Sequence, residues 1–220
     1  MKNINTVDYW NTRFSSGDWE NKKGRLQTFR FAQEQAGRLG LTSTFSGVLL
    51  DFGCGLGDAM PVYKKTFPMA KLIGVDHSPI AITKCREKYS NLAEFICCEG
   101  NEVPIVDVIV ASNVFEHLSN DVLIARELIK KCKKLFIIVP YQEVLSGGSH
   151  EHINSYDENS YSELTCLRTA SYVSYGLGQK CFMDLVYNVW VKNIFRFFFH
   201  GKIWRYKPVK EILFEIKGEK

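Results

Sequence analysis

Three glycines at alternate positions, Gly53, Gly55 and Gly57, follow a short apolar run with Asp51 at the junction. The run is typical of a buried strand, and glycines after it let the backbone pass close to a ligand. The next acid to close an apolar run is Asp76. A carboxylate at the end of a second strand is placed to accept hydrogen bonds from both hydroxyls of a ribose. Together these residues predict a nucleoside pocket.

The spacing of the glycines narrows the kind of nucleoside. A dinucleotide fingerprint needs a third glycine three residues after the second, so that a helix N-terminus faces a pyrophosphate. That position is Asp58 here, and its carboxylate would repel phosphate. Acids on both sides of the loop suit a cationic or amine-bearing ligand instead.

With these motifs, residues 49–140 resemble the class I S-adenosylmethionine-dependent methyltransferases. The first motif of that family reads acid-x-Gly-x-Gly-x-Gly, and its second strand ends in an acid. The resemblance implies an enzyme that uses S-adenosylmethionine. It implies that Asp51 orients the loop and receives the amino group of the cofactor, and that Asp76, with His77 beside it, binds the ribose. The alternative roles are caps: Asp51 for backbone amides, and Asp76 for the following helix.

The resemblance extends to two later segments. Glu99 and Gly100 align with the positions that bind the adenine, although the family more often has Asp there, which makes Asn101 a competing candidate. Asn113 falls where the family borders the methionyl group and the acceptor. His117 is a candidate proton acceptor, because imidazole titrates near neutrality; the alternative is a histidine fixed by local hydrogen bonds.

The N-terminal block resembles the lid of small-molecule methyltransferases. This implies a cation–π contact from Trp10 to the sulfonium and an ion pair from Arg25 to the cofactor carboxylate, although Trp10 and Trp19 can equally be packing residues. His150 and His152 follow the fifth predicted strand and would share a face if extended, so either could be a base. We discount metal binding, because a histidine pair without a clearly placed third ligand is weak evidence.

Apolar runs separated by helical segments predict an α/β fold, a doubly wound and mostly parallel seven-stranded sheet with its ligand at the carboxyl ends of the strands. The expected strands and helices are given in chain order. They are helix 24–39, strand 47–52, helix 58–66, strand 71–75, helix 80–89, strands 93–98 and 106–111, helix 120–131, and strands 135–139, 170–175 and 211–216. In methyltransferases of this type the last two strands form an antiparallel edge pair. We divide the chain into an N-terminal lid and helix, 1–46, and a methyltransferase domain, 47–220.

Residues 181–206 form an aromatic and basic insert before the last strand. Polar residues recur every four positions from Asp184 to His200, which indicates a helix with one polar stripe and an otherwise apolar circumference. From Lys180 to Lys220 the chain carries five more basic than acidic residues, and the rest has a net charge of −1. The insert is expected to cover the domain, a partner or second copy, or a membrane surface.

The composition fits one compact unit in the cytoplasm, with contact to the inner face of the membrane left open. The seven cysteines lack a paired-ligand spacing, which fits reduced thiols and argues against zinc. The start of the chain shows neither a signal peptide nor a spanning segment.

The sequence therefore predicts methyl transfer to a small molecule or to a sugar or glycolipid, most simply to oxygen. A non-catalytic binding or scaffold subunit is the alternative. A nucleic-acid substrate is not expected, because the basic tail is also strongly apolar and no Asn-Pro-Pro-Tyr-like motif follows the fourth strand.

Overall fold

The computed structural model describes residues 4–145, 151–174, 190–201 and 209–220. Its strands are β1 (Val48–Phe52), β2 (Lys71–Asp76), β3 (Glu94–Cys97), β4 (Val108–Ser112), β5 (Lys134–Pro140), β6 (Cys166–Ser174) and β7 (Val209–Lys217). Its helices are α1 (Val7–Ser15), α2 (Asp18–Asn21), α3 (Gly24–Ala36), α4 (Met60–Thr66), α5 (Pro79–Tyr89), α6 (Asp121–Ile129) and α8 (Lys192–His200), with 3-10 turns η1 (Gly100–Glu102) and η2 (Phe115–His117).

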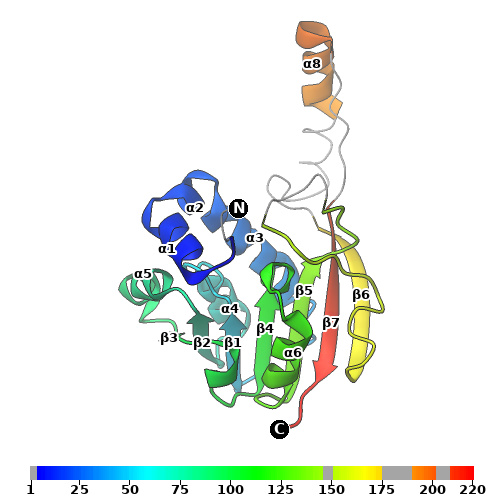
Figure 1. Ribbon diagram of the computed structural model, residues 1–220. Helices are drawn as coiled ribbons and strands as arrows, with labels where there is room; N and C mark the ends of the chain where they lie inside the picture. Colours follow the sequence, from blue (N-terminus) through cyan, green and yellow to red (C-terminus); the bar gives the residue numbers. More distant parts are fainter. Residues whose placement is uncertain (1–3, 146–150, 175–189, 202–208) are drawn as a thin grey trace.

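The seven strands form one sheet in the order β3-β2-β1-β4-β5-β7-β6, with helices on both faces (Figure 1). Strands β1 to β5 are parallel to their neighbours, and β7 runs antiparallel between β5 and β6. The order reverses between β1 and β4, so the carboxyl ends of these strands border a crevice suited to a ligand. The predicted fold class, including the antiparallel edge pair, is confirmed, although β6 begins four residues earlier than expected.

Both faces of the sheet are buried. Leu49 and Leu50 are adjacent in β1 and point to opposite faces, yet neither is exposed to solvent. This explains why the strands are continuous apolar runs rather than alternating ones. Ala32 and Ala36 of α3 pack in the same cluster as Leu49, so α3 belongs to the core of the domain. In contrast, α1 and α2 lie over the carboxyl end of the sheet (Figure 1).

The insert predicted at 181–206 is described only at residues 190–201, and the rest of it lies outside the described residues. Helix α8 stands away from the sheet (Figure 1), and Phe197, Phe198 and Phe199 are all exposed. Of the three alternatives for the insert, cover for its own domain does not hold for these residues. Among the described helices, none has both the length and the apolar character that a membrane crossing requires. The six described cysteines are free thiols, as expected.

Candidate functional site

A cavity of about 660 Å³ lies at the carboxyl ends of β1 to β4, where the chain passes into the loops after each strand. Its volume falls within the range of small-molecule and cofactor sites, about 300–1,000 Å³. Most of the predicted site residues line it: Trp10, Gly53, Gly55, Asp76, His77, Glu99, Gly100, Asn113 and His117. Four other predicted site residues do not line the cavity: Arg25, Asp51, Gly57 and His152. His150 lies outside the described residues.

The three loop glycines have different roles. All have a positive φ, which side-chain-bearing residues rarely adopt. A Cβ on Gly53 would lie 2.4 Å from Val114, whereas a Cβ on Gly55 would have only ordinary contacts. Gly57 faces α5 instead, where its Cβ would lie 3.1 Å from Cys85 Sγ. Gly53 and Gly55 therefore bring bare backbone to the cavity, and Gly57 packs the loop against a helix.

The two strand-end acids are both buried. Asp76 Oδ2 accepts from Gly55 N at 2.9 Å, and Asp76 Oδ1 accepts from Ser78 N at 2.8 Å. Ser78 caps α5 through its own hydroxyl, which accepts from Ala81 N. Each carboxylate oxygen keeps a further lone pair for a ligand hydroxyl. Burial raises the pKa of Asp76, and burial followed by the charge of Asp76 raises the pKa of Asp51 to about 7.

Arg25 and Asp58 are joined outside the cavity. Arg25 Nε lies 3.5 Å from Asp58 Oδ1, and the Arg25 side chain is 66% exposed. The same carboxylate oxygen accepts from Lys88 Nζ at 2.8 Å and from the Tyr89 hydroxyl at 2.7 Å. Asp58 therefore ties the loop to α5. Arg25 does not line the cavity, and its ion pair with a cofactor carboxylate stays a prediction.

Aromatic side chains from α1 and α2 form one wall of the cavity. Trp10 stacks on Phe14 with 5.7 Å between ring centroids, and both contact Trp19 edge-on. All three line the cavity. The Arg13 guanidinium lies over Trp10 and Trp19, at 5.4 and 5.3 Å from their ring centroids. The role of Phe14 was missed in the sequence, although it follows Trp10 at helical spacing.

Helix α1 is tied to the segment that follows β5. Tyr9 and Arg13 both bond to the Glu151 carboxylate, and Asn5 Nδ2 donates to the Glu151 carbonyl at 2.7 Å. The helix itself was not predicted, although its cap is visible in the sequence: Thr6 Oγ1 accepts from Tyr9 N at 3.3 Å. The aromatic wall and the segment around residue 151 are therefore positioned together.

The segment after β3 forms the wall next to β2. Glu99 and Glu102 form a capping box at the start of η1, where each side chain accepts from the backbone amide of the other residue. Glu99 is exposed, and both it and Asn101 line the cavity. Glu99 and Asn101, the two candidates for binding an adenine amino group, can therefore both contact a ligand in the cavity.

Asn113 and His117 border the cavity after β4. Asn113 has a φ of +53°, and its Nδ2 lies 3.3 Å from Ser112 Oγ and from Glu211 Oε1, so its amide is held by the protein. The His117 ring lies edge-on to Trp10, with 5.4 Å between centroids. Burial lowers the pKa of His117 to about 4, so its imidazole is neutral at pH 7.

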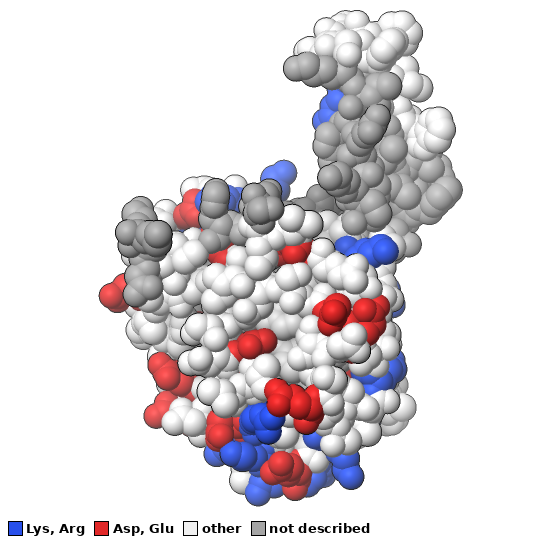
Figure 2. Space-filling view, turned by 45° about the vertical axis from the view of Figure 1, so that its right-hand side comes forward, with Lys and Arg blue, Asp and Glu red and all other residues white. Residues whose placement is uncertain are grey.

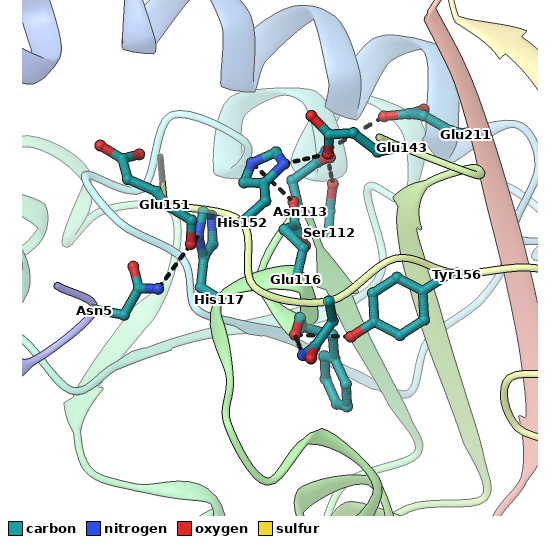
Figure 3. A network of polar contacts seen from close by, with 12 residues as sticks. Asn5, Ser112, Asn113, Glu116, His117, Glu143, Glu151, His152, Tyr156 and Glu211 are labelled. Carbon is teal, nitrogen blue, oxygen red and sulfur yellow. Dashed lines mark hydrogen bonds and ion pairs between the residues drawn. The ribbon is translucent and has the colours of Figure 1, made fainter. Parts of the chain in front are cut away.

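His152 lies behind His117, with 4.9 Å between the two ring centroids. The residues after it anchor the turn on η2, since Ile153 N donates to the Glu116 carbonyl at 2.8 Å and Asn154 Nδ2 donates to the Phe115 carbonyl at 3.0 Å. His152 Nδ1 is bonded to the Glu143 carboxylate (Figure 3). No role was predicted for Glu116 or Glu143. The only local signal for them was that Glu116 directly precedes His117.

Comparison with known proteins agrees with this geometry. Residues 49–135 match the family model described as a methyltransferase domain. No curated protein matches the chain. A chain in the complex of the Haloferax volcanii Trm112 methyltransferase activator with a putative methyltransferase is similar at 13% identity and a TM-score of 0.66, with 96% of this chain and 98% of that chain covered.

Two further structures are similar over most of their length. The plantazolicin methyltransferase BpumL, in complex with a monoazolic desmethylPZN analog and SAH, is 21% identical with a TM-score of 0.59 and coverage of 96% and 94%. A SAM-dependent methyltransferase from Aquifex aeolicus is 18% identical with a TM-score of 0.59 and coverage of 89% and 97%. The [4+2]-cyclase SpnF has the same TM-score at 16% identity, so the fold alone does not define a reaction.

The match is a similarity of residues 49–135, less than half of the chain, to a methyltransferase domain. Together with the fold, it supports a class I S-adenosylmethionine-dependent methyltransferase, which is an enzyme.

Proposed function

We propose that the protein binds S-adenosylmethionine in the 660 Å³ cavity and transfers its methyl group to an oxygen of a small molecule or of a sugar, including a glycolipid. One observation carries this proposal. The cavity joins the bare backbone of Gly53 and Gly55, the buried carboxylate of Asp76 and the aromatic wall around Trp10. These are groups that fit, respectively, a closely packed ligand, ribose hydroxyls and a cationic sulfur.

The other end of the ligand is assigned on the same basis. Glu99 or Asn101 accepts from the adenine amino group, and Gly100 N is the adjacent backbone donor. Asn113 borders the methionyl group. His77 lines the cavity directly after Asp76, so it contacts the ribose side of the ligand. Asp51 is buried at the end of β1 and does not line the cavity, so it supports the loop rather than contacting the ligand directly.

The bound cofactor would supply a methyl group that is already activated on a sulfonium. The protein then has to align the acceptor and exclude water. Trp10, Phe14 and Trp19 exclude water on one side, and the neutral imidazole of His117 lies on the acceptor side with a lone pair available. His152 is the second candidate base, and it lies behind His117.

Calorimetry with S-adenosylmethionine and S-adenosylhomocysteine tests the proposal. Asp76→Ala should weaken binding of both about 10- to 100-fold, because hydrogen bonds to a charged group contribute about 1.5–3 kcal/mol. Glu94→Ala is the control, since it removes an exposed acid at the amino end of β3, far along the strand from the cavity. Unchanged affinity in Asp76→Ala would contradict the ribose assignment.

A binding or scaffold subunit is the second candidate, favoured by the exposed apolar face of α8 and by the similarity to a chain from an activator complex. Transfer of a labelled methyl group to any acceptor from a panel of sugars, phenols and glycolipids would rule this candidate out. Tight binding of S-adenosylhomocysteine with no transfer to any member of the panel would favour it.

We further propose a cytoplasmic protein that uses the α8 face to meet the inner membrane surface or a second copy of the chain. Phe195, Phe198 and Phe199 of α8 are exposed beside the basic residues Lys192 and Arg196. A nucleic-acid partner is not proposed. On the face seen in Figure 2, the basic and acidic side chains of the described residues are interspersed rather than gathered into one basic surface.

A further inference from the structure

Glu116 is a buried carboxylate without a hydrogen bond among the described residues. The residue is 0% exposed, and within the described part of the chain neither of its carboxylate oxygens has a hydrogen-bond partner. Burial, with the charges of Glu211 and Glu143 in addition, raises its pKa well above the usual range. A buried polar group without a partner destabilises a fold and therefore calls for a specific explanation.

Two imidazoles lie beside this carboxylate, and each is already held through Nδ1 (Figure 3). His117 Nδ1 lies 3.0 Å from the Glu151 carbonyl, which can only accept, so Nδ1 carries the proton. His152 Nδ1 is bonded to the Glu143 carboxylate in the same way. In the neutral form of each ring, the lone pair is therefore on Nε2. His152 Nε2 lies 4.0 Å from Glu116 Oε1.

This pattern is the one that metal-binding histidines adopt. A histidine ligand usually donates its other ring N–H to a carboxylate or a backbone carbonyl, which fixes the tautomer and the direction of the ring. Both partners are present here, Glu143 for His152 and the Glu151 carbonyl for His117. One candidate ligand atom from each of Glu116, His117 and His152 lies within 4.8 Å of the other two.

We propose that Glu116, His117 and His152 bind a divalent first-row transition-metal ion beside the cofactor cavity. Glu116 is the third ligand that the sequence did not show. Two imidazoles and one carboxylate are a common donor set for Zn²⁺ and for Fe²⁺ sites that keep open positions. At bond lengths of about 2.1 Å, neighbouring ligand atoms of a tetrahedral site lie about 3.4 Å apart. The ligand atoms now lie within 4.8 Å of one another, so the distances between them would shorten by about 1 Å when the ion binds.

A proton explains the cluster less well than a metal ion. A proton on Glu116 would need an acceptor at hydrogen-bonding distance, and its nearest ring nitrogen is 4.0 Å away, too far for a hydrogen bond. It would also leave the lone pair of His117 without a partner. A metal ion satisfies the carboxylate and both lone pairs at once, and with the ion bound His117 and His152 act as ligands rather than as bases.

Of the three ligands only His117 lines the cavity, where it lies against Trp10, so a bound acceptor would meet the ion on the His117 side. Three protein ligands leave room for further donors. They suit an acceptor with oxygen donors, such as neighbouring hydroxyls of a sugar. This assignment of a ligand class rests on the proposed function, whereas the metal site itself does not.

Metal binding to the full chain, purified without a histidine tag and stripped with a chelator, tests the site. We expect one Co²⁺ or Mn²⁺ per chain, measured by Co²⁺ absorption and by calorimetry. Glu116→Gln and His152→Ala should each weaken binding at least about 10-fold, and Glu143→Gln should weaken it about 10-fold through its hold on His152. His200→Ala, on exposed α8, is the matched control and should bind like the wild type.

Thermal unfolding separates this role from a structural one. Added Co²⁺ should raise the melting temperature of the wild type and leave that of Glu116→Gln unchanged, because only the wild type keeps the carboxylate ligand. If Glu116→Gln and His152→Ala fail to fold, Glu143→Gln carries the comparison. Absence of binding to the wild type at millimolar Co²⁺, or equal binding by wild type and Glu143→Gln, overturns the proposal. Affinity for S-adenosylhomocysteine, measured on the same samples, reports separately on the proposed function.

Discussion

Replacement of Asp51 by Asn should remove the loss of stability that Asp51 causes as the pH rises. Asp51 is fully enclosed at the end of β1, and burial followed by the charge of Asp76 raises its pKa from 3.8 to about 7. The native state then holds a proton that the unfolded chain releases. Stability is complete below about pH 4 and falls as the pH rises to about 7.

The size of this effect follows from the pKa. At about 1.4 kcal/mol per pH unit, a rise from 3.8 to about 7 removes at most about 4 kcal/mol. Asp51→Asn keeps the shape without the charge. The variant should therefore match the wild type near pH 4 and exceed it by up to about 4 kcal/mol near pH 8.

Urea unfolding of the two proteins between pH 4 and 8 measures this difference. Asp107→Asn is a control of opposite sign, because a hydrogen bond from Lys133 and another from Val48 N lower the pKa of Asp107. That variant should lose stability at pH 7 and regain parity in acid. A stability difference for Asp51→Asn that does not change with pH, or a variant less stable at pH 8, would refute the reasoning.

Two further substitutions test the packing of the loop and the exposure of α8. Gly53→Ala should lower the free energy of unfolding in urea by about 2–5 kcal/mol, because of the positive φ and the clash with Val114. Gly37→Ala is the control, because it has open space around it, and should change the free energy of unfolding by less than about 1 kcal/mol. Equal effects of the two substitutions would contradict this account. Phe197→Asp combined with Phe198→Asp should reduce vesicle association or dimer formation, measured by sedimentation and light scattering, at an unchanged melting temperature. A lower melting temperature with neither association affected would show instead that the helix is core.

Much of the sheet could be predicted because its strands are buried on both faces. Leu49 and Leu50 are both enclosed, so β1 shows as an uninterrupted apolar run with a glycine loop directly after it. β6 was placed too late, because its first residues are exposed and its apolar pattern is weak. The short helix α1 was missed for a similar reason: only Phe14 of its residues is buried.

Local sequence also does not show the partners of charged side chains that lie far along the chain. Arg25 appeared free to meet a cofactor carboxylate, but it pairs with Asp58. Asp58 is in turn held by Lys88, 30 residues further on. Such ion pairs depend on how α3 and α5 pack on the loop after β1, which no local pattern encodes.

The cluster around Glu116 could not be found from spacing alone. His152 reaches Glu116 because the turn at Ile153 and Asn154 bonds back onto η2. The segment between β5 and this turn offers no periodic signal. The sequence therefore paired His152 with His150, whereas the structure brings His152 to Glu116 and His117.

A structure of the full chain with S-adenosylhomocysteine tests the central claim most directly. The account predicts density for an adenosyl group in the cavity over Gly53 and Gly55, with both ribose hydroxyls donating to Asp76 and the sulfur facing Trp10. The account is contradicted if the ligand binds elsewhere, or if the cavity stays empty at saturating ligand because the chain itself fills it.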